Sequence, residues 1–150
     1  MHYEVEDFRD IKDELVPITQ AHWEDVALNQ DSVALNPDWG VYEYLQEHGN
    51  LQIVTARNDE GVMVGYVVYI ISPWLHYRDH ILADGDVFWL HPDYRKGLTG
   101  IKLLRAAEDF LKQYGVDFII NKVKLHKDIG PLFERMGFKP IERVYAKRIS

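Results

Sequence analysis

Residues 90–104 read LHPDYRKGLTGIKLL, and this stretch decides which fold we expect. An apolar run ends at Leu90, a loop with two glycines and two cations follows, and a helical pattern begins near Thr99. The first backbone N–H groups of a helix have no partner within it, and the helix dipole adds positive potential there. Because glycine lets a ligand approach the backbone closely, the stretch suits a phosphate or diphosphate group. An ordinary strand-to-helix turn with solvated charges would have the same pattern.

Strand-like and helical patterns alternate on both sides of this stretch. They predict strands at about residues 3–6, 51–56, 62–71, 81–90, 116–123 and 141–149. They predict helices from Asp10 to Val26 with a kink or a restart at Pro17, from Asn36 to Gly49, from Thr99 to Tyr114 and from Pro131 to Met136. This order predicts an α/β sandwich with a mixed sheet, built as one domain over residues 1–150.

The composition indicates a globular chain and excludes several kinds of site. Hydrophobic residues make up 47% of the 150 residues, which is enough to form one buried core. The chain has no cysteine, so disulfides, thiolate metal sites and cysteine nucleophiles are excluded. The seven histidines have no ligand spacing and no H-E-x-x-H motif occurs, so we expect no metal.

The formal net charge of -7 disfavours a nucleic-acid partner, whose binding rests on neutralising phosphates. The same charge is compatible with a cationic substrate such as an amine, or with acidity that only maintains solubility. The longest apolar run, Val62 to Ile71, is too short to span a bilayer, and the N-terminus does not resemble a signal peptide. We therefore expect a cytoplasmic protein without a membrane partner.

Two motifs, together with the order of elements, resemble the GCN5-related N-acetyltransferases, the GNAT family. The phosphate loop of that family reads Gln/Arg-x-x-Gly-x-Gly/Ala after a strand. Here Arg95 takes its first position and Gly100 its last, while Leu98 stands at the fourth and Gly97 comes one place earlier. The family's second motif, a short helix that ends in Gly-Phe, is matched by FERMGF at residues 133–138. The irregular loop is most similar to short acetyltransferase-like proteins of tailed phages.

The resemblance implies an α+β fold with a mixed, mostly antiparallel sheet of six to seven strands flanked by about four helices. It also implies an acyltransferase in which a primary amine attacks acetyl-CoA directly, without a metal. The acceptor stays open between a small molecule, a polyamine, a protein lysine and a protein N-terminus, and so does a homodimer. The alternative is a non-catalytic module that binds coenzyme A or a protein partner, in a phage particle or, in the host cytoplasm, against a host target.

The resemblance further assigns the coenzyme site to the loop and the helix start. The backbone N–H near Leu90 would polarise the thioester carbonyl. The remaining cofactor-binding residues would be Arg95, Lys96, Gly97, Leu98, Thr99, Gly100 and Ile101.

Three residues are candidates for catalysis on the same basis. Asp86, in the strand before the loop, would accept the amine proton, or it simply faces solvent. His126 stands where the family often has an asparagine that contacts the cofactor, or it only caps a strand end. Tyr145, on the expected last strand, is a further proton donor. Phe133 occupies the position where the family often has a tyrosine, and it cannot donate a proton.

Aromatic residues in the helical region and in the turn after the third strand would frame the acceptor pocket. Trp39, Trp74 and Tyr77 are the main candidates, and such residues could hold an ammonium group through cation–π contacts. Further candidates in the same regions are Trp23, Asp38, Tyr42 and His76, with ionic contact from the acid. Alternatively Trp39 is an anchor of the hydrophobic core.

Overall fold

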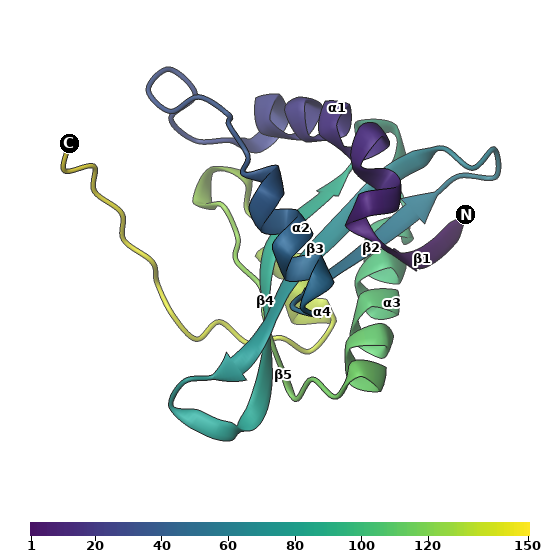
Figure 1. Cartoon of the computed structure of the whole chain (residues 1–150). Coiled ribbons are helices and arrows are strands. Elements are labelled where there is room, and N and C mark those ends of the chain that lie inside the picture. Colours follow the sequence, from purple (N-terminus) through teal and green to yellow (C-terminus); the bar gives the residue numbers. More distant parts are fainter.

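Five strands form one sheet in which each strand lies beside the next one along the chain (Figure 1). The computed structural model describes residues 1–150. The first four strands pair in antiparallel fashion, and only β4 and β5 run parallel. The expected mixed, mostly antiparallel sheet is confirmed, but the expectation of six to seven strands is wrong. The strands are β1 (His2–Glu6), β2 (Leu51–Arg57), β3 (Met63–Trp74), β4 (Tyr77–Leu90) and β5 (Phe118–Ile120).

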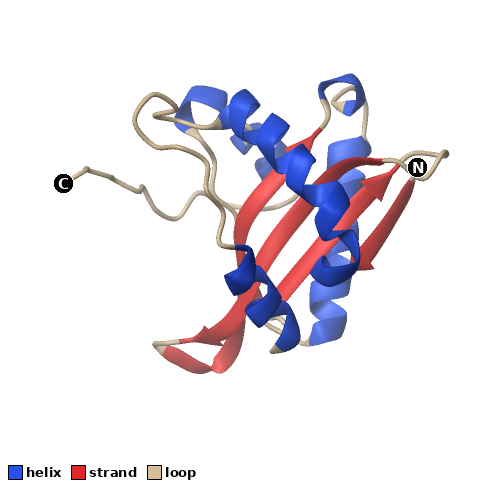
Figure 2. Ribbon diagram, turned by 45° about the horizontal axis from the view of Figure 1, so that its top comes forward, coloured by secondary structure: helices blue, strands red, loops and turns tan.

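Helices cover both faces of the sheet (Figure 2). They are α1 (Phe8–Val26), α2 (Trp39–Glu47), α3 (Thr99–Tyr114) and α4 (Gly130–Arg135), with short 3-10 turns η1 (Pro92–Tyr94) and η2 (Leu125–Lys127). The expected number of about four helices is thus confirmed. None of these helices combines the length and the apolar character that crossing a membrane would require.

The hydrophobic core consists of two clusters, one on each face of the sheet. The central strand β3 contributes to both, because its side chains alternate between the faces. Val67 and Tyr69 belong to the cluster under α3, whereas Tyr66 and Val68 belong to the cluster under α1. This double burial explains why residues 63–71 of β3 include no charged side chain.

Helix α1 begins earlier than the sequence indicated and continues through Pro17 without restarting as a second piece. Its first turn is capped by Asp7 rather than Asp10, because the Asp7 carboxylate accepts a hydrogen bond of 2.9 Å from the backbone N–H of Arg9. Pro17 lies inside the helix, where a proline costs about 3 kcal/mol. Each buried apolar side chain stabilises the fold by about 1.5–3 kcal/mol, which offsets the cost of the proline. The helix buries three of them in its first half, namely Phe8, Ile11 and Leu15.

Two further element boundaries differ from the expected ones. Helix α2 begins at Trp39 and not at Asn36, because the carboxylate of Asp38 caps it by accepting a 3.1 Å bond from the N–H of Val41. Residues 27–38 therefore form a long connection between α1 and α2. Strand β3 continues past Pro73 as far as Trp74.

Residues 141–149 do not form the expected last strand. After α4 the chain runs away from the sheet as a segment without regular structure, yellow in Figure 1. Its apolar side chains are exposed, including Ile141 and Val144. The physical reason is visible in the order of residues, since Ile141 and Val144 fall on opposite faces of a strand and charged residues accompany both. Neither face could be buried as a whole.

Candidate functional site

Strands β4 and β5 separate halfway along β4. Their parallel pairing includes Ala83 with Ile119 and Asp84 with Ile120, and it ends there. Strand β4 continues to Leu90, so no strand pairs with the outer edge of its last residues. Gly85 lies at the separation point, where a Cβ atom would come within 2.7 Å of the Asn121 side chain and 3.0 Å of a backbone oxygen. Strand β5 is accordingly shorter than the expected 116–123.

A β-bulge lies next to this point. Val68 pairs with Val87, and Tyr69 pairs with Gly85, so Asp86 is an extra residue in β4. Consecutive side chains of a regular strand point to opposite faces. Because of the bulge, Asp86 and Val87 both reach the face that α1 and α2 cover, and both line the cavity described below.

The connection from β4 to α3 leaves a row of backbone amides free. The N–H of Lys102 is the first that bonds back into the helix, to the Leu98 carbonyl at 2.9 Å. No side chain caps this helix start, and the amides from Gly97 to Ile101 have no partner within the chain. Gly97 has φ of +78° with no atom within 4 Å of a Cβ position, so space is open in front of it. The local geometry is that of an anion site.

Arg95 connects this loop to the rest of the protein. Its Nε donates a 2.7 Å hydrogen bond to the carbonyl of Leu90, and its terminal nitrogen contacts the Asp25 carboxylate at the end of α1. Lys127 forms a second ion pair with Asp25, at 2.6 Å. The hydrogen bond from Arg95, reinforced by that from Lys127, lowers the pKa of Asp25 to about 2. The Lys96 side chain, in contrast, is exposed.

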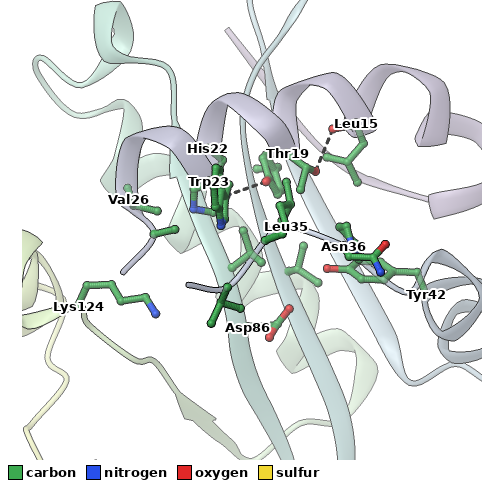
Figure 3. A pocket seen from close by; sticks show the side chains of 17 residues that line it. Leu15, Thr19, His22, Trp23, Val26, Leu35, Asn36, Tyr42, Asp86 and Lys124 are labelled. Atoms are coloured by element: carbon green, nitrogen blue, oxygen red, sulfur yellow. Dashed lines mark hydrogen bonds between the residues drawn. The ribbon is translucent and has the colours of Figure 1, made fainter. Parts of the chain in front are cut away.

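A cavity of about 430 Å³ lies on the face of β4 that α1 and α2 cover (Figure 3). It is bounded by α1, the connection between α1 and α2, and the strands β3 and β4, with Asp86 at its edge (Figure 3). Eleven of its seventeen lining residues are hydrophobic. The eleven include Tyr42 and Tyr66, whose hydroxyls add to the polar groups of Thr19, His22, Asn36, Asp86 and Lys124.

Burial changes the ionisation of the polar groups in this cavity. It lowers the pKa of His22 to about 4, and the His22 ring shares a 2.8 Å hydrogen bond with the Tyr66 hydroxyl. Burial, followed by the nearby Asp86 carboxylate, raises the pKa of Tyr42 to about 12. At neutral pH His22 and Tyr42 are therefore uncharged, and Asp86 forms no ion pair within the chain.

Trp23 and Tyr42, which the sequence suggested for an acceptor pocket, also line this cavity, whereas His126, Tyr145 and Trp39 lie outside it. His126 is exposed and its Nε2 lies 3.0 Å from the carbonyl oxygen of Val26. The Tyr145 side chain is 86% exposed on the C-terminal segment, not on a strand. Trp39 stacks on Phe8 in the core, with ring centres 5.7 Å apart.

Trp74 and Tyr77 lie at the hairpin between β3 and β4. Their rings are 4.7 Å apart, and Trp74 also packs against Phe118 at 5.0 Å. Neither residue lines the cavity. Phe133 is buried against Phe88 under the start of α3.

Sequence reasoning did not assign His22 and Tyr66 to a site, nor residues 27–37 of the connection between α1 and α2. One signal was present, because His22 continues the apolar stripe of Ile11, Leu15 and Ile18 along α1. A polar residue on a buried stripe indicates either a satisfied core histidine or a site. The structure shows both, since His22 bonds to Tyr66 and lines the cavity.

Comparison with known proteins identifies both the sequence pattern and the fold. The model of the acetyltransferase (GNAT) family matches residues 8–138. No protein of curated function matches the chain. The fold resembles that of ribosomal-protein-alanine N-acetyltransferase from Brucella melitensis, with 19% identity and a TM-score of 0.72 over 99% of this chain and all of the other.

Two further solved structures share the fold. An aminoglycoside acetyltransferase from an uncultured soil metagenomic sample, solved with sisomicin, is 17% identical with a TM-score of 0.74, covering 99% of this chain and 95% of that one. A transcriptional regulator from Bacillus halodurans is 19% identical with a TM-score of 0.76, covering 99% and 100%. At these identities the likeness concerns the fold alone.

Proposed function

The chain belongs to the GNAT family of acetyltransferases, and from this premise we propose that it transfers an acetyl group from acetyl-CoA to a primary amine. The observation that carries the proposal is the arrangement around the end of β4. Free amides at the start of α3 suit the diphosphate of the coenzyme, and the Asp86 carboxylate, which forms no ion pair, lies at the bulge eleven residues before Gly97. The unpaired edge of β4 connects the two places.

The residues of the loop fit the coenzyme in their chemistry. The amides from Gly97 to Ile101 are donors without partners, and the open space at Gly97 admits a bulky anion. Arg95 acts indirectly in this proposal, because two of its donor groups already hold Leu90 and Asp25. It thereby fixes the path of the loop.

Asp86 is proposed as the base. An alkylamine has a pKa of about 10, so it must lose a proton before it attacks a carbonyl at neutral pH. The amine nitrogen then bonds to the acetyl carbon, the C–S bond breaks, and coenzyme A leaves as a thiolate. A thiol with a pKa of about 8.5 leaves readily, so the mechanism does not depend on a tyrosine at the position of Phe133. The proposal assigns no role in this step to His126 or Tyr145, neither of which lines the cavity.

The test measures release of free thiol from acetyl-CoA by the purified protein in the presence of pooled primary amines. Release that depends on added amine supports the proposal, and mass spectrometry of the amine must show an added acetyl group. Calorimetry with coenzyme A runs in parallel. Binding of the coenzyme without thiol release for any amine would instead support the non-catalytic module, and absence of binding would contradict the site itself.

A further inference from the structure

The cavity beside Asp86 is mainly apolar, and this restricts what it can bind. Its walls include Trp23 and Val26 from α1, Leu35 from the connection to α2, and Val87 from β4. Figure 3 shows Leu35 and Trp23 extending over the space between the helix and the strands. A volume of about 430 Å³ lies within the usual range of small-molecule sites, roughly 300–1,000 Å³.

The charges in the cavity are one anion and one cation. Asp86 carries the negative charge and Lys124 the positive charge, and no other lining residue is a carboxylate or a basic lysine or arginine. His22 adds no charge near neutral pH, since burial lowers its pKa to about 4. A bound molecule with one ammonium group finds a partner in Asp86. A second ammonium group would find no other carboxylate among the lining residues, and the charge of Lys124 would repel it.

From this distribution we propose that the acceptor is a small primary monoamine with an aromatic or aliphatic body, whose ammonium end meets Asp86 and whose body lies against Trp23 and Leu35. The inference rests on the proposed function and names its substrate class. It predicts that acceptors with several ammonium groups, such as polyamines and aminoglycosides, are poor substrates. It also predicts that protein acceptors are poor substrates, because their extended polar backbone finds few hydrogen-bond partners on these walls.

The first experiment compares kcat/KM for 2-phenylethylamine, spermidine, an aminoglycoside and a short peptide with a free N-terminus. We expect 2-phenylethylamine to exceed each of the others by at least about tenfold, which is the effect of one unpaired polar or charged group. A higher kcat/KM for spermidine, the aminoglycoside or the peptide would overturn the inference, while acetylation of any of them would leave the proposed function intact.

The second experiment reverses the single positive charge of the cavity. Lys124→Glu should raise the ratio of kcat/KM for spermidine over that for 2-phenylethylamine by at least about fivefold, because the second ammonium group gains a carboxylate partner. Lys139→Glu is the matched control, since it makes the same change of net charge on an exposed residue outside the cavity. Equal ratios in the two variants would overturn the assignment of Lys124.

The third experiment does not depend on turnover. Calorimetric titration of 2-phenylethylamine into the full chain should show binding that Leu35→Asp weakens at least about fivefold. Leu28→Asp is the control, because Leu28 lies in the same connection, is 60% exposed and does not line the cavity. Binding with this pattern but without acetylation would contradict the proposed function alone. Absence of binding, or equal loss in both variants, would overturn the inference.

Discussion

The two faces of β4 present two regions that are built in different ways. Towards α3, the region suited to an anion consists of consecutive backbone amides, from Gly97 to Ile101. Any sequence that forms this turn would present the same amides. Towards α1, the cavity consists of side chains from α1, the connection to α2, α2 itself, β3, β4 and the segment before η2, which are far apart in the sequence. The first region comes from one short segment and suits a ligand that stays the same, such as a diphosphate. The second is assembled by the fold from several segments, so its side chains can change to suit a different acceptor.

The largest expected effect separates chemistry from coenzyme binding. Asp86→Asn removes the proposed base with almost no change in shape, so kcat should fall by about a hundredfold to ten-thousandfold. The dissociation constant of coenzyme A, measured by calorimetry, should stay the same because the amides are untouched. Asp84→Asn is the control, since Asp84 pairs with Lys122 at 2.8 Å and does not line the cavity. Equal losses of kcat in both variants would contradict a special role for Asp86.

The second prediction addresses the amide region alone. Gly97→Asp places a carboxylate in front of the free amides, so we expect coenzyme A to bind about tenfold to a hundredfold more weakly than to Gly97→Asn. Both side chains tolerate the positive φ of this position better than other residues do, and they differ mainly in charge. Calorimetric titration of both variants gives the comparison. Equal affinities would place the diphosphate elsewhere.

A smaller effect concerns the side chains that form the cavity. Tyr66→Phe removes the hydroxyl that shares a 2.8 Å hydrogen bond with His22 and leaves a buried ring nitrogen without its partner. The free energy of unfolding, measured with urea, should fall by about 1–2 kcal/mol. Tyr44→Phe should have almost no effect, because Tyr44 is 59% exposed. A wild-type stability for Tyr66→Phe would mean that this hydrogen bond does not stabilise the cavity.

The smallest effect concerns the ion pairs that connect the two regions. The pKa of Asp25 is about 2 in the folded chain, below its ordinary value of 3.8, so its pairs with Arg95 and Lys127 stabilise the fold above about pH 4. This contribution is lost as the pH falls from about 4 to 2, because protonation then favours the unfolded chain. Asp25→Asn should lower the free energy of unfolding by about 1 kcal/mol at pH 7, after allowance for solvent screening.

Denaturant titrations of the wild type and Asp25→Asn at several pH values check this prediction. The difference between the two proteins should shrink steadily below about pH 4. A difference that stays constant down to pH 2 would show that the charge of Asp25 is not responsible for it.

The sequence predicted the parts of the molecule that depend on local patterns. Helix α3 begins at Thr99 and is followed by Gly115, as expected, because an amphipathic face and a glycine cap specify it without help from other segments. The last strand was wrong because Ile141 and Val144 have β-like character but no common face to bury. The sequence pointed to Trp23, Tyr42 and Asp86 as site residues, and all three line the cavity. The cavity wall at residues 33–37 was missed because it has no periodic pattern, and only the fold brings it to Asp86.

The extra residue in β4 has a consequence for how the sheet tolerates change. Since Asp86 is an insertion relative to the pairing of β3, deleting it would let Gly85 and Val87 follow each other with regular alternation, and Phe88 would still face α3. The carboxylate thus occupies a position that the architecture can gain or lose without rearranging its neighbours. The fold does not require a carboxylate at this point of the strand, so this side chain can change without loss of the fold.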